Sequence, residues 1–276
     1  MCHPKVVLVT GASSGNGRAI ATLLSQRGYT VFGTSRRPAQ TQPSPGFDLL
    51  ELDVCSDDSV RECVEAVLER AGRLDVLVNN AGYELAGALE ETSLDEARAQ
   101  LDTNFFGVVR MVKAALPRMR QQRSGRIVNI SSLAGLAPTP FMGMYSASKF
   151  AVEGFTASLR IEVQPFGIHV SQVEVGFLNT TMKAHRQRTA ERIAEYDAPR
   201  ARALETIVEQ EERGPDAGLV ARSVLDIVGQ RRPRLRYVIG RQARTVALLQ
   251  RFLPEGIFEQ GLKRTFRLDA ASESRP

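Results

Sequence analysis

The sequence predicts an α/β fold in which a doubly wound parallel sheet lies between two layers of helices. Short runs rich in β-branched residues alternate with longer stretches that carry apolar residues three and four positions apart, which is the pattern of βαβ units. The first short run leads directly into a glycine-rich loop. A chain of 276 residues with 43% hydrophobic residues can bury a large core, so we expect one domain over residues 1–276.

The expected strands are short, apolar and bounded by glycine or polar residues. They are Val6–Val9, Thr30–Gly33, Asp48–Leu52, Val76–Asn79, Gly125–Ile130, Ile168–Val173 and Arg236–Ile239. The expected helices lie between them and cover Gly17–Arg27, Asp58–Ala71, Leu94–Arg120 and Tyr145–Val163. Right-handed crossovers would place these strands in one layer.

Two segments do not follow this alternation. Residues from about 178 to 215 are rich in Arg and Glu, and residues 241–276 form a C-terminal extension. We interpret the first segment as a substrate loop or lid insertion. Both segments are candidates for substrate specificity.

Charge and cysteine content favour a cytoplasmic protein that does not bind nucleic acid. The 36 basic and 31 acidic residues give a formal charge of +5 but are mixed along the chain. The three cysteines, Cys2, Cys55 and Cys63, form no C-x-x-C pair, so we expect no disulfide framework and a reducing environment.

The sequence offers no membrane or metal signal. The apolar run at residues 6–9 is too short for a signal-peptide core or a membrane span, so a membrane location is not expected. The histidines are His3, His169 and His185, and none has a carboxylate or cysteine at a typical ligand spacing. We therefore expect no metal.

A glycine-rich loop follows the first expected strand and opens the first helix. It reads Thr10-Gly11-Ala12-Ser13-Ser14-Gly15-Asn16-Gly17. Backbone amides at a helix N-terminus point toward an anion, and glycines permit the tight turn and the close approach of a pyrophosphate. By itself the loop is also compatible with a simple turn from strand to helix.

The end of the second strand favours NADP(H) over NAD(H). An NAD site usually has an acidic residue here to bind the ribose 2′-hydroxyl, whereas this chain has Thr34-Ser35-Arg36-Arg37. A guanidinium can pair with a 2′-phosphate through two hydrogen bonds, and Ser14 could add another. The alternative is that these arginines are solvated surface residues.

Polar residues also follow the third and fourth strands. Asp53 could accept a hydrogen bond from the adenine amino group. Asn79-Asn80-Ala81-Gly82 ends the fourth strand, at the sheet edge where ligands bind in such folds.

Tyr145 and Lys149 lie four residues apart and therefore on one face of a helix. A tyrosine with a pKa near ~10 is a poor base at neutral pH, and lowering the pKa by about three units requires roughly 4 kcal/mol of phenolate stabilisation. A nearby Lys⁺ and an oxidised nicotinamide supply positive charge for this. In isolation the two residues could instead be an exposed polar pair on the helix surface.

Taken together, the glycine loop, Asn79–Gly82, Asn104, Ser132, Tyr145 and Lys149 resemble the motif set of the short-chain dehydrogenase/reductase family. The resemblance covers residues from about 5 to 180 and implies a Rossmann-like three-layer α/β/α fold. It implies that Tyr145 exchanges the substrate proton and that Ser132, thirteen residues earlier, hydrogen-bonds the carbonyl oxygen. Ser131 is the rival for the serine role. Lys149 would bind the nicotinamide ribose and lower the tyrosine pKa, and Asn104 would hold a relay water.

The cofactor site that we expect combines the motif residues with those at the strand ends. It comprises Gly11, Ser13, Ser14, Gly15, Asn16, Gly17, Ser35, Arg36, Asp53, Val54, Asn80, Ala81, Gly82, Tyr145, Lys149, Val175, Gly176 and Thr180. The chain departs from the family pattern twice. Asn16 stands where Ile is common, and Glu174-Val175-Gly176 stands where the family has Pro-Gly, which should loosen that loop by up to about 1 kcal/mol.

The expected substrate pocket is apolar and partly adaptable. Its candidate walls are Phe141, Met142 and Met144 before the tyrosine and Phe177, Leu178 and Met182 after the last core strand, although all could be core residues instead. The tail, with Leu248–Pro254, Ile257, Phe258 and Phe266, is amphipathic and basic, which could suit a membrane surface, but we expect it to pack on the protein itself or on a partner subunit. The motif order and tail are similar to those of the branch with 17β-hydroxysteroid and retinol dehydrogenases.

The sequence therefore predicts an NADP(H)-dependent oxidoreductase that moves hydride between nicotinamide and a lipophilic ketone, aldehyde or secondary alcohol, with carbonyl reduction favoured. The resemblance implies a homodimer or homotetramer. Two alternatives remain at this point: an NAD-linked alcohol dehydrogenase, and a catalytically silent nucleotide-sensing protein of the same fold.

Overall fold

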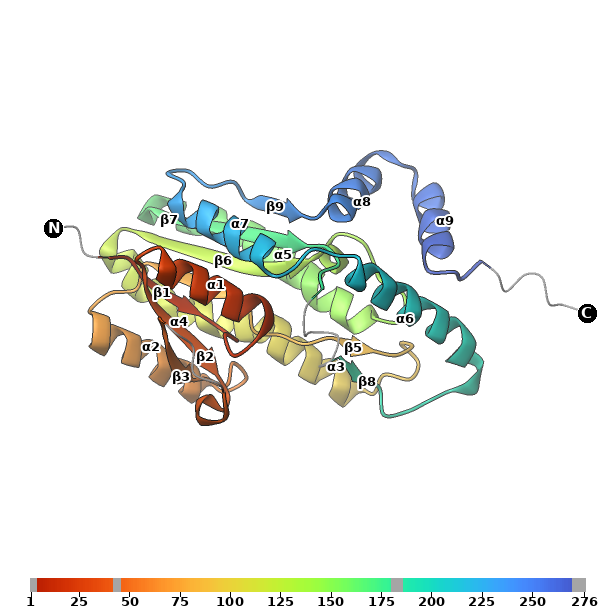
Figure 1. The fold of residues 1–276 in the computed structure, drawn as a ribbon, viewed down its shortest axis with the longest axis horizontal. Helices are drawn as coiled ribbons and strands as arrows, with labels where there is room; N and C mark the ends of the chain where they lie inside the picture. Colours follow the sequence, from red (N-terminus) through yellow and green to blue (C-terminus); the bar gives the residue numbers. More distant parts are fainter. Residues whose placement is uncertain (1–3, 42–45, 180–185, 270–276) are drawn as a thin grey trace, which may run out of the picture.

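A seven-stranded parallel sheet forms the centre of the computed structural model, which describes residues 4–41, 46–179 and 186–269 (Figure 1). The strand order is β3-β2-β1-β4-β6-β7-β9. The strands are β1 (Val6–Val9), β2 (Thr30–Ser35), β3 (Asp48–Glu51), β4 (Val76–Asn79), β6 (Gly125–Ser132), β7 (Ile168–Val175) and β9 (Arg236–Ile239). From β1 the chain first builds outward to β3 and then returns to β4, so the sheet is doubly wound about the β1–β4 pair.

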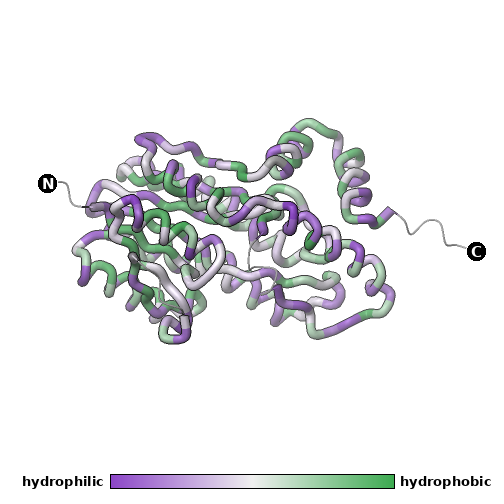
Figure 2. The backbone as a smooth tube through the Cα atoms, viewed as in Figure 1, coloured by the Kyte–Doolittle hydropathy of each residue, from purple (hydrophilic) through white to green (hydrophobic). Residues whose placement is uncertain are grey.

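Helices cover both faces of the sheet, as predicted. One face packs against α1 (Gly15–Gln26) and α7 (Gly218–Gly229). The other packs against α2 (Asp57–Ala71), α4 (Gly107–Gln122) and α5 (Gly143–Val163). Both cores draw on residues of β1, β4, β6 and β7, which is why these strands are rich in apolar residues (Figure 2).

The residues of β1 show how one strand serves both cores. Val6 and Leu8 belong to the core beneath α2, α4 and α5, and Val7 and Val9 to the core beneath α1 and α7. Alternate side chains of a strand point to opposite faces of the sheet. A run of four apolar residues is therefore needed when neither face meets water.

Several boundaries differ from the prediction. β2, β6 and β7 are each two residues longer than expected, and β3 ends at Glu51. Because β6 and β7 continue together, Ser132 pairs with Val175 in the last register position. The expectation that Val175 lies in a loosened loop is wrong, since Val175 also pairs with Ile239 of β9. Valine, unlike proline, keeps the backbone N–H and the β-branched side chain that suit a strand.

The long helix expected over Leu94–Arg120 is interrupted. It consists of α3 (Leu94–Leu101), a π-helical turn at Asp102–Phe106, and α4. Ser93 and Glu96 form a capping box at its start. The π turn brings Asn104 to the sheet, where it is buried.

Elements that the sequence pattern did not predict lie at one end of the sheet. They are the two-stranded parallel sheet of β5 (Leu85–Ala86) and β8 (Gln187–Arg188), α6 (Asp197–Glu212), α8 (Arg241–Phe252) and α9 (Glu255–Thr265). The helix α7, which covers one face of the sheet, was not predicted either. Short 3-10 turns lie at Pro38–Gln40, Leu133–Gly135, Gln164–Phe166 and Ala194–Tyr196. In the segment from about 178 to 215, the described residues 186–215 thus contain β8, a 3-10 turn and α6. Figure 1 shows α6, α8 and α9 gathered beyond the ends of β6 and β7.

Candidate active site

The glycine-rich loop is joined to the end of β4 by hydrogen bonds. The Thr10 hydroxyl accepts from the backbone N–H groups of Asn80 and Ala81 at 2.9 and 3.0 Å. The Asn80 amide donates to the carbonyl oxygens of Thr10 and Gly11 at 3.0 and 3.1 Å. These bonds hold the predicted residues of both segments at the carboxyl edge of the sheet.

Two glycines of the loop cannot be replaced without moving backbone. Gly11 has a φ of +66°, in the left-handed region. A Cβ at Gly17 would lie 2.2 Å from the Gly11 carbonyl oxygen and 2.5 Å from the Asn80 amide nitrogen. The start of α1 therefore packs directly on the loop backbone. No side chain of these two glycines covers the carboxyl edge of the sheet, where a ligand would bind.

The same corner fits the phosphates of a dinucleotide. Ser14, the N-cap residue of α1, makes no side-chain cap bond, so the first amides of the helix have no such partner. The buried Oδ1 of Asn16 has no hydrogen-bond partner among the described residues, and Asn16 lines the cavity at this edge. Helix amides bind an anion, and an orphaned amide oxygen can accept a hydrogen bond from a bound group.

The end of β2 presents basic side chains only. Arg36 and Arg37 are exposed, and the Ser35 hydroxyl accepts from the Arg37 backbone N–H at 3.2 Å. Asp53, beyond β3, is exposed and accepts from the Cys55 N–H at 3.0 Å, and Val54 next to it is buried. The predicted adenosine-side residues thus line the edges of neighbouring strands β2 and β3.

Tyr145 and Lys149 lie one turn apart on α5, as predicted. Both are buried, and the Lys149 Nζ lies 5.7 Å from the centre of the tyrosine ring. Nζ donates to the Ile130 carbonyl oxygen at 3.0 Å, which joins α5 to β6. Burial lowers the pKa of Lys149 to about 8.

The pKa of Tyr145 is raised, not lowered, in this structure. Burial is the main cause, and the negative charge of Glu84 adds to it, while a hydrogen bond with Ser132 opposes it. A phenol with a raised pKa holds its proton firmly. The expected lowering by Lys149 and an oxidised nicotinamide therefore stays a prediction for the cofactor-bound protein.

The serine that faces the tyrosine is Ser132. It ends β6, and its hydroxyl accepts from the Ala134 N–H at 3.1 Å and hydrogen-bonds with Tyr145. Ser131, the rival, is more deeply buried, and its hydroxyl has no partner among the described residues. The structure favours Ser132 because its oxygen and the phenol can approach one substrate atom together.

Asn104 acts as a clamp between segments. Its Oδ1 accepts from the Tyr83 N–H at 3.0 Å, and its Nδ2 donates to the Tyr83 carbonyl oxygen at 2.9 Å and to the Ser148 hydroxyl at 3.2 Å. It thereby fixes the segment after Gly82 against α5. Its expected role in holding a relay water stays a prediction.

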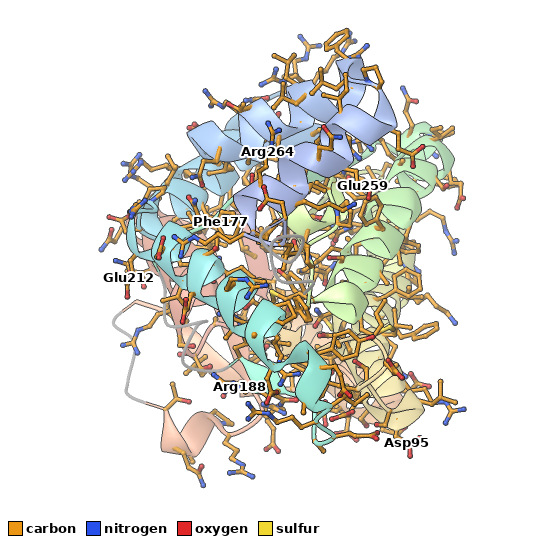
Figure 3. The ribbon with its side chains drawn as sticks, turned by 90° about the vertical axis from the view of Figure 1, so that its right-hand side faces the viewer. Asp95, Phe177, Arg188, Glu212, Glu259 and Arg264 are labelled. Atoms are coloured by element: carbon orange, nitrogen blue, oxygen red, sulfur yellow. The ribbon has the colours of Figure 1, made fainter. Side chains whose placement is uncertain are left out.

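A cavity of about 830 Å³, part of it open to solvent, lies where these residues meet. Tyr145, Ser132, Lys149, Asn104, Asn16 and Gly176 all line it. Of the predicted apolar walls, Met142, Phe177 and Leu178 line the cavity, whereas Phe141 and Met144 do not. Seen from the side in Figure 3, Phe177 lies between α6 and the helix that carries Arg264.

Three charged side chains beside the tyrosine were missed by the sequence analysis. Glu84, Arg186 and Glu211 are buried together, with the Arg186 Nε donating to Glu84 Oε2 at 2.8 Å and Nη2 donating to Glu211. They come from separate segments: the residues before β5, those before β8, and the last turn of α6. No motif or periodicity joins them in the sequence.

Residues 5–191 match the sequence profile described as short chain dehydrogenase. This span includes the glycine loop, Ser132, Tyr145 and Lys149. The chain belongs to the short-chain dehydrogenase family. It is accordingly an oxidoreductase by family, as the sequence motifs predicted.

Relatives within the family include proteins that act on lipids and steroids by name. A 3-ketodihydrosphingosine reductase of Bacteroides thetaiotaomicron is 39% identical over 95% of this chain and 97% of its own. Retinol dehydrogenase 8 of Homo sapiens is 44% identical over 63% of this chain and 58% of its own. 17-Beta-hydroxysteroid dehydrogenase type 1 of Mus musculus is 42% identical over 64% of this chain and 55% of its own. The predicted branch is confirmed.

Solved family members share the fold and hold either nucleotide. A short-chain dehydrogenase from Streptomyces avermitilis is 32% identical, with a TM-score of 0.81 over 98% of this chain and 99% of that one. A Burkholderia phymatum member in complex with NAD is 26% identical (TM-score 0.77; 94% and 97% covered). A metagenomic member in complex with NADP is also 26% identical (TM-score 0.67; 85% and 96% covered). The Rossmann-like fold prediction is confirmed.

Some predicted residues lie outside the described part of the chain. These are Cys2, His3, Thr180, Met182 and His185. Cys55 and Cys63 are free thiols. Within residues 4–41, 46–179 and 186–269, no three His, Cys, Asp or Glu side chains gather as metal ligands would, and no helix combines the length and apolar character that a membrane crossing requires.

Proposed function

We propose that this family member is an NADP(H)-dependent oxidoreductase that interconverts a lipophilic ketone or aldehyde and the corresponding alcohol. The observation that carries the proposal is the pair of hydroxyls, Tyr145 and Ser132, that hydrogen-bond one another at the wall of a largely apolar cavity. A bound nicotinamide would supply the hydride in reduction or accept it in oxidation.

In reduction, the hydride would add to the carbonyl carbon and negative charge would build on the carbonyl oxygen. Ser132 would donate a hydrogen bond to that oxygen, and Tyr145 would transfer its phenolic proton to it, so that the product is a neutral alcohol. Lys149, cationic below its pKa of about 8, would then stabilise the phenolate that Tyr145 leaves behind. In oxidation the proton moves the other way.

Arg36 supports the choice of NADP(H). It is exposed just after β2, next to Ser35, and the chain has no acidic residue at positions 34–37, so a 2′-phosphate could meet its guanidinium there. Since Asn16 carries an orphaned amide oxygen in the cavity, the loop also offers a hydrogen-bond acceptor to the cofactor.

The test of the chemistry is the Tyr145→Phe variant. It should lose at least about 10³-fold in kcat with NADPH and a ketone, because the proton donor is gone while the ring and the cofactor site remain. The substrates to assay are 3-ketodihydrosphingosine, retinal and a 17-ketosteroid, since the relatives' names point to these classes. Full turnover by the variant would reject the mechanism and favour a nucleotide-sensing protein.

The test of the cofactor is the Arg36→Ala variant. Its Kd for NADPH should rise about tenfold to a hundredfold, with little change for NADH, because only NADPH carries the 2′-phosphate that Arg36 would bind. Arg27→Ala, on the far end of α1, is the matched control. An unchanged NADPH affinity would favour the NAD-linked alternative.

We further propose that the protein is a cytoplasmic homodimer or homotetramer. Under this proposal residues from about 178 to 215 act as a substrate lid and residues 241–276 as a specificity extension. Light scattering of the purified chain would measure the subunit number.

A further inference from the structure

A layer of buried polar side chains lies between α5 and the strands β6 and β7, next to Lys149. Gln172 and Glu174 of β7 point to the same face of the sheet as Ser131 of β6, which pairs with Glu174 in the strand register. Glu153 comes from α5, one turn after Lys149. These five residues are at most 8% exposed. The proposed chemistry uses Lys149 alone among them.

The two carboxyl groups of this layer lie together. Glu174 is hydrogen-bonded to Glu153, and Gln172 Nε2 donates to Glu174 Oε1 at 3.1 Å and to Glu153 Oε2. Two carboxylates in contact repel each other when both are ionised, so the pair tends to hold one proton. Burial and then the charge of Glu153 raise the pKa of Glu174 to about 7. The pair can therefore bind and release a proton near neutral pH.

One end of the layer reaches solvent at Arg236, on the edge strand β9. The Arg236 side chain is 51% exposed, and its Nε lies 3.1 Å from Glu174 Oε1 and 3.4 Å from Glu153 Oε2. A guanidinium stays protonated, so Arg236 marks the solvent end of the layer and does not itself carry the proton. From α8, Arg244 donates to the carbonyl oxygen of Val238, the register partner of Glu174, at 3.4 Å.

The other end of the layer reaches the cavity at Ser131, which lines it together with Tyr145 and Lys149. A Cβ at Gly135 would lie 3.0 Å from Ser131 Oγ and 3.2 Å from Glu153 Cγ. The hydroxyl and the carboxyl side chain therefore flank one small space, which glycine does not fill with a side chain. The carboxyl pair is thus separated from the cavity by a single hydroxyl.

Several oxygens along this layer have no hydrogen-bond partner among the described residues. They are Ser131 Oγ, Glu153 Oε1, Gln172 Oε1 and Glu174 Oε2. Proteins rarely bury polar atoms unbonded, and such atoms are bonded by ordered water or used in function. A hydroxyl and a protonated carboxyl can each donate one proton while accepting another. These groups are therefore suited to pass protons between the solvent edge and the cavity.

We infer that Glu153, Glu174 and Ser131 form a proton relay that returns a proton to the Tyr145–Lys149 pair after each reduction. This inference rests on the proposed oxidoreductase function and deepens it. Reduction takes one hydride from the nicotinamide and one proton from Tyr145, which is left as phenolate. The carboxyl pair then releases its proton through the Ser131 hydroxyl to the cavity, and regains one from water at the solvent edge. Only O–H and N–H bonds form or break in these steps, and oxidation reverses them.

The first test compares the first turnover with the steady state in Glu174→Gln, Glu153→Gln and Ser131→Ala. Tyr145 already carries its proton when the reaction starts. With NADPH and the ketone that the wild type reduces fastest, the first hydride transfer in stopped flow should stay within about twofold of the wild type. Steady-state kcat should fall at least about tenfold, because Tyr145 has to recover its proton before the next turnover.

The second test supplies the proton from solution. Imidazole buffer of increasing concentration, at constant pH and ionic strength, should raise the kcat of the variants at least about threefold and leave the wild type unchanged. A small acid that enters the cavity can protonate the phenolate directly, whereas it cannot correct a structural defect. Glu162→Gln, an exposed position on the same helix as Glu153, is the matched control and should keep the wild-type kcat with and without imidazole.

The outcomes separate the relay from a structural role and from the proposed function. An unchanged kcat in the variants, or a lowered kcat that imidazole does not raise, would overturn the relay. First turnovers slowed as much as kcat would show that the layer only supports α5, and in Ser131→Ala alone would place that hydroxyl at the substrate oxygen. No turnover of any ketone by the wild type with either nucleotide would overturn the oxidoreductase function itself. If one variant fails to fold, the other two decide.

Discussion

Glu174 shows how one buried carboxyl group changes the electrostatics of the sheet edge. It lies on β7 just before the cofactor loop and is fully buried, with Arg236 at 3.1 Å and the carboxylate of Glu153 nearby. Burial and then the Glu153 charge raise its pKa to about 7. Three buried oxygens in this group, on Glu153, Gln172 and Glu174, have no hydrogen-bond partner among the described residues.

This raised pKa predicts a pH-dependent stability. Between about pH 4.5 and 7 the folded protein keeps the Glu174 proton that the unfolded chain has lost, so stability falls as pH rises through this window. The Glu174→Gln variant should not lose this stability as the pH rises, because glutamine does not ionise. Its Tm should exceed that of the wild type by a few degrees at pH 8 and match it near pH 4.5, as measured by calorimetry. A pH-independent difference would show that Glu174 is ionised in the folded protein throughout.

Among the elements, the π turn at Asp102–Phe106 has the clearest functional consequence. In a π turn the backbone hydrogen bonds join residues five positions apart, so the side chains that follow point in other directions than in a regular α-helix. Such turns often occur at functional sites. Here it lets Asn104 bond both backbone groups of Tyr83 and the Ser148 hydroxyl. Asn104 thus helps to position the segment that leads to Glu84, together with Gln100, which donates to the Tyr83 carbonyl oxygen and accepts from the Leu85 N–H.

The Asn104→Asp variant should distinguish a structural role of Asn104, through its bonds to Tyr83 and Ser148, from a role in a proton relay. The carboxylate can still accept from the Tyr83 N–H, but it cannot donate to the Tyr83 carbonyl oxygen or to Ser148. We expect a loss of about 1–3 kcal/mol in the free energy of unfolding, because the Tyr83 carbonyl, among the described residues, keeps only its bond from Gln100 and because a charge is buried. Urea denaturation measures this loss, with the exposed Asp95→Asn as control. A stable variant whose kcat alone is lower would instead indicate a role in proton transfer.

The elements that the sequence predicted are those whose pattern follows from burial. β1 and β4 are covered on both faces, so they appear as nearly continuous apolar runs, and β6 and β7 keep enough buried Ile and Val to be recognised as strands. The π turn could not be predicted, because it changes a hydrogen-bond register without changing the apolar spacing. The β5–β8 pair is too short, at two residues each, to show any period.

The candidate site also contains residues that the sequence predicted and residues that it did not. Tyr145, Lys149 and Ser132 were predictable because the first two lie four residues apart on a helix and because all three, with Ser132 thirteen residues before the tyrosine, resemble the motif set of the family. Glu84, Arg186 and Glu211 were not, because their proximity depends on how α6 and the β8 segment return to the cavity. Charge clusters built from three distant segments leave no local trace in a sequence.

At the scale of the whole molecule, the C-terminal extension packs against the hydrophobic cluster that contains Tyr145. Phe266, just after α9, is buried in a hydrophobic cluster with Tyr145, Met142 and Ile207. Arg267 next to it pairs with Glu209 of α6 at 2.8 Å. The end of α9 is thus attached to the same helix that carries Glu211, as the position of the two helices in Figure 3 also shows.

Phe266→Ala should therefore weaken both the fold and the site. Deleting a buried phenyl ring costs about 3–5 kcal/mol, and the gap would lie next to the cavity wall at Met142 and Tyr145. We expect a lower Tm and a higher KM for a lipophilic ketone, measured by calorimetry and steady-state kinetics. Phe252→Ala is the matched control in the same extension: its side chain is 69% exposed, so its effect on stability should stay within about 0.5 kcal/mol. Equal KM values in the two variants would show that the extension packs on the domain without shaping substrate binding.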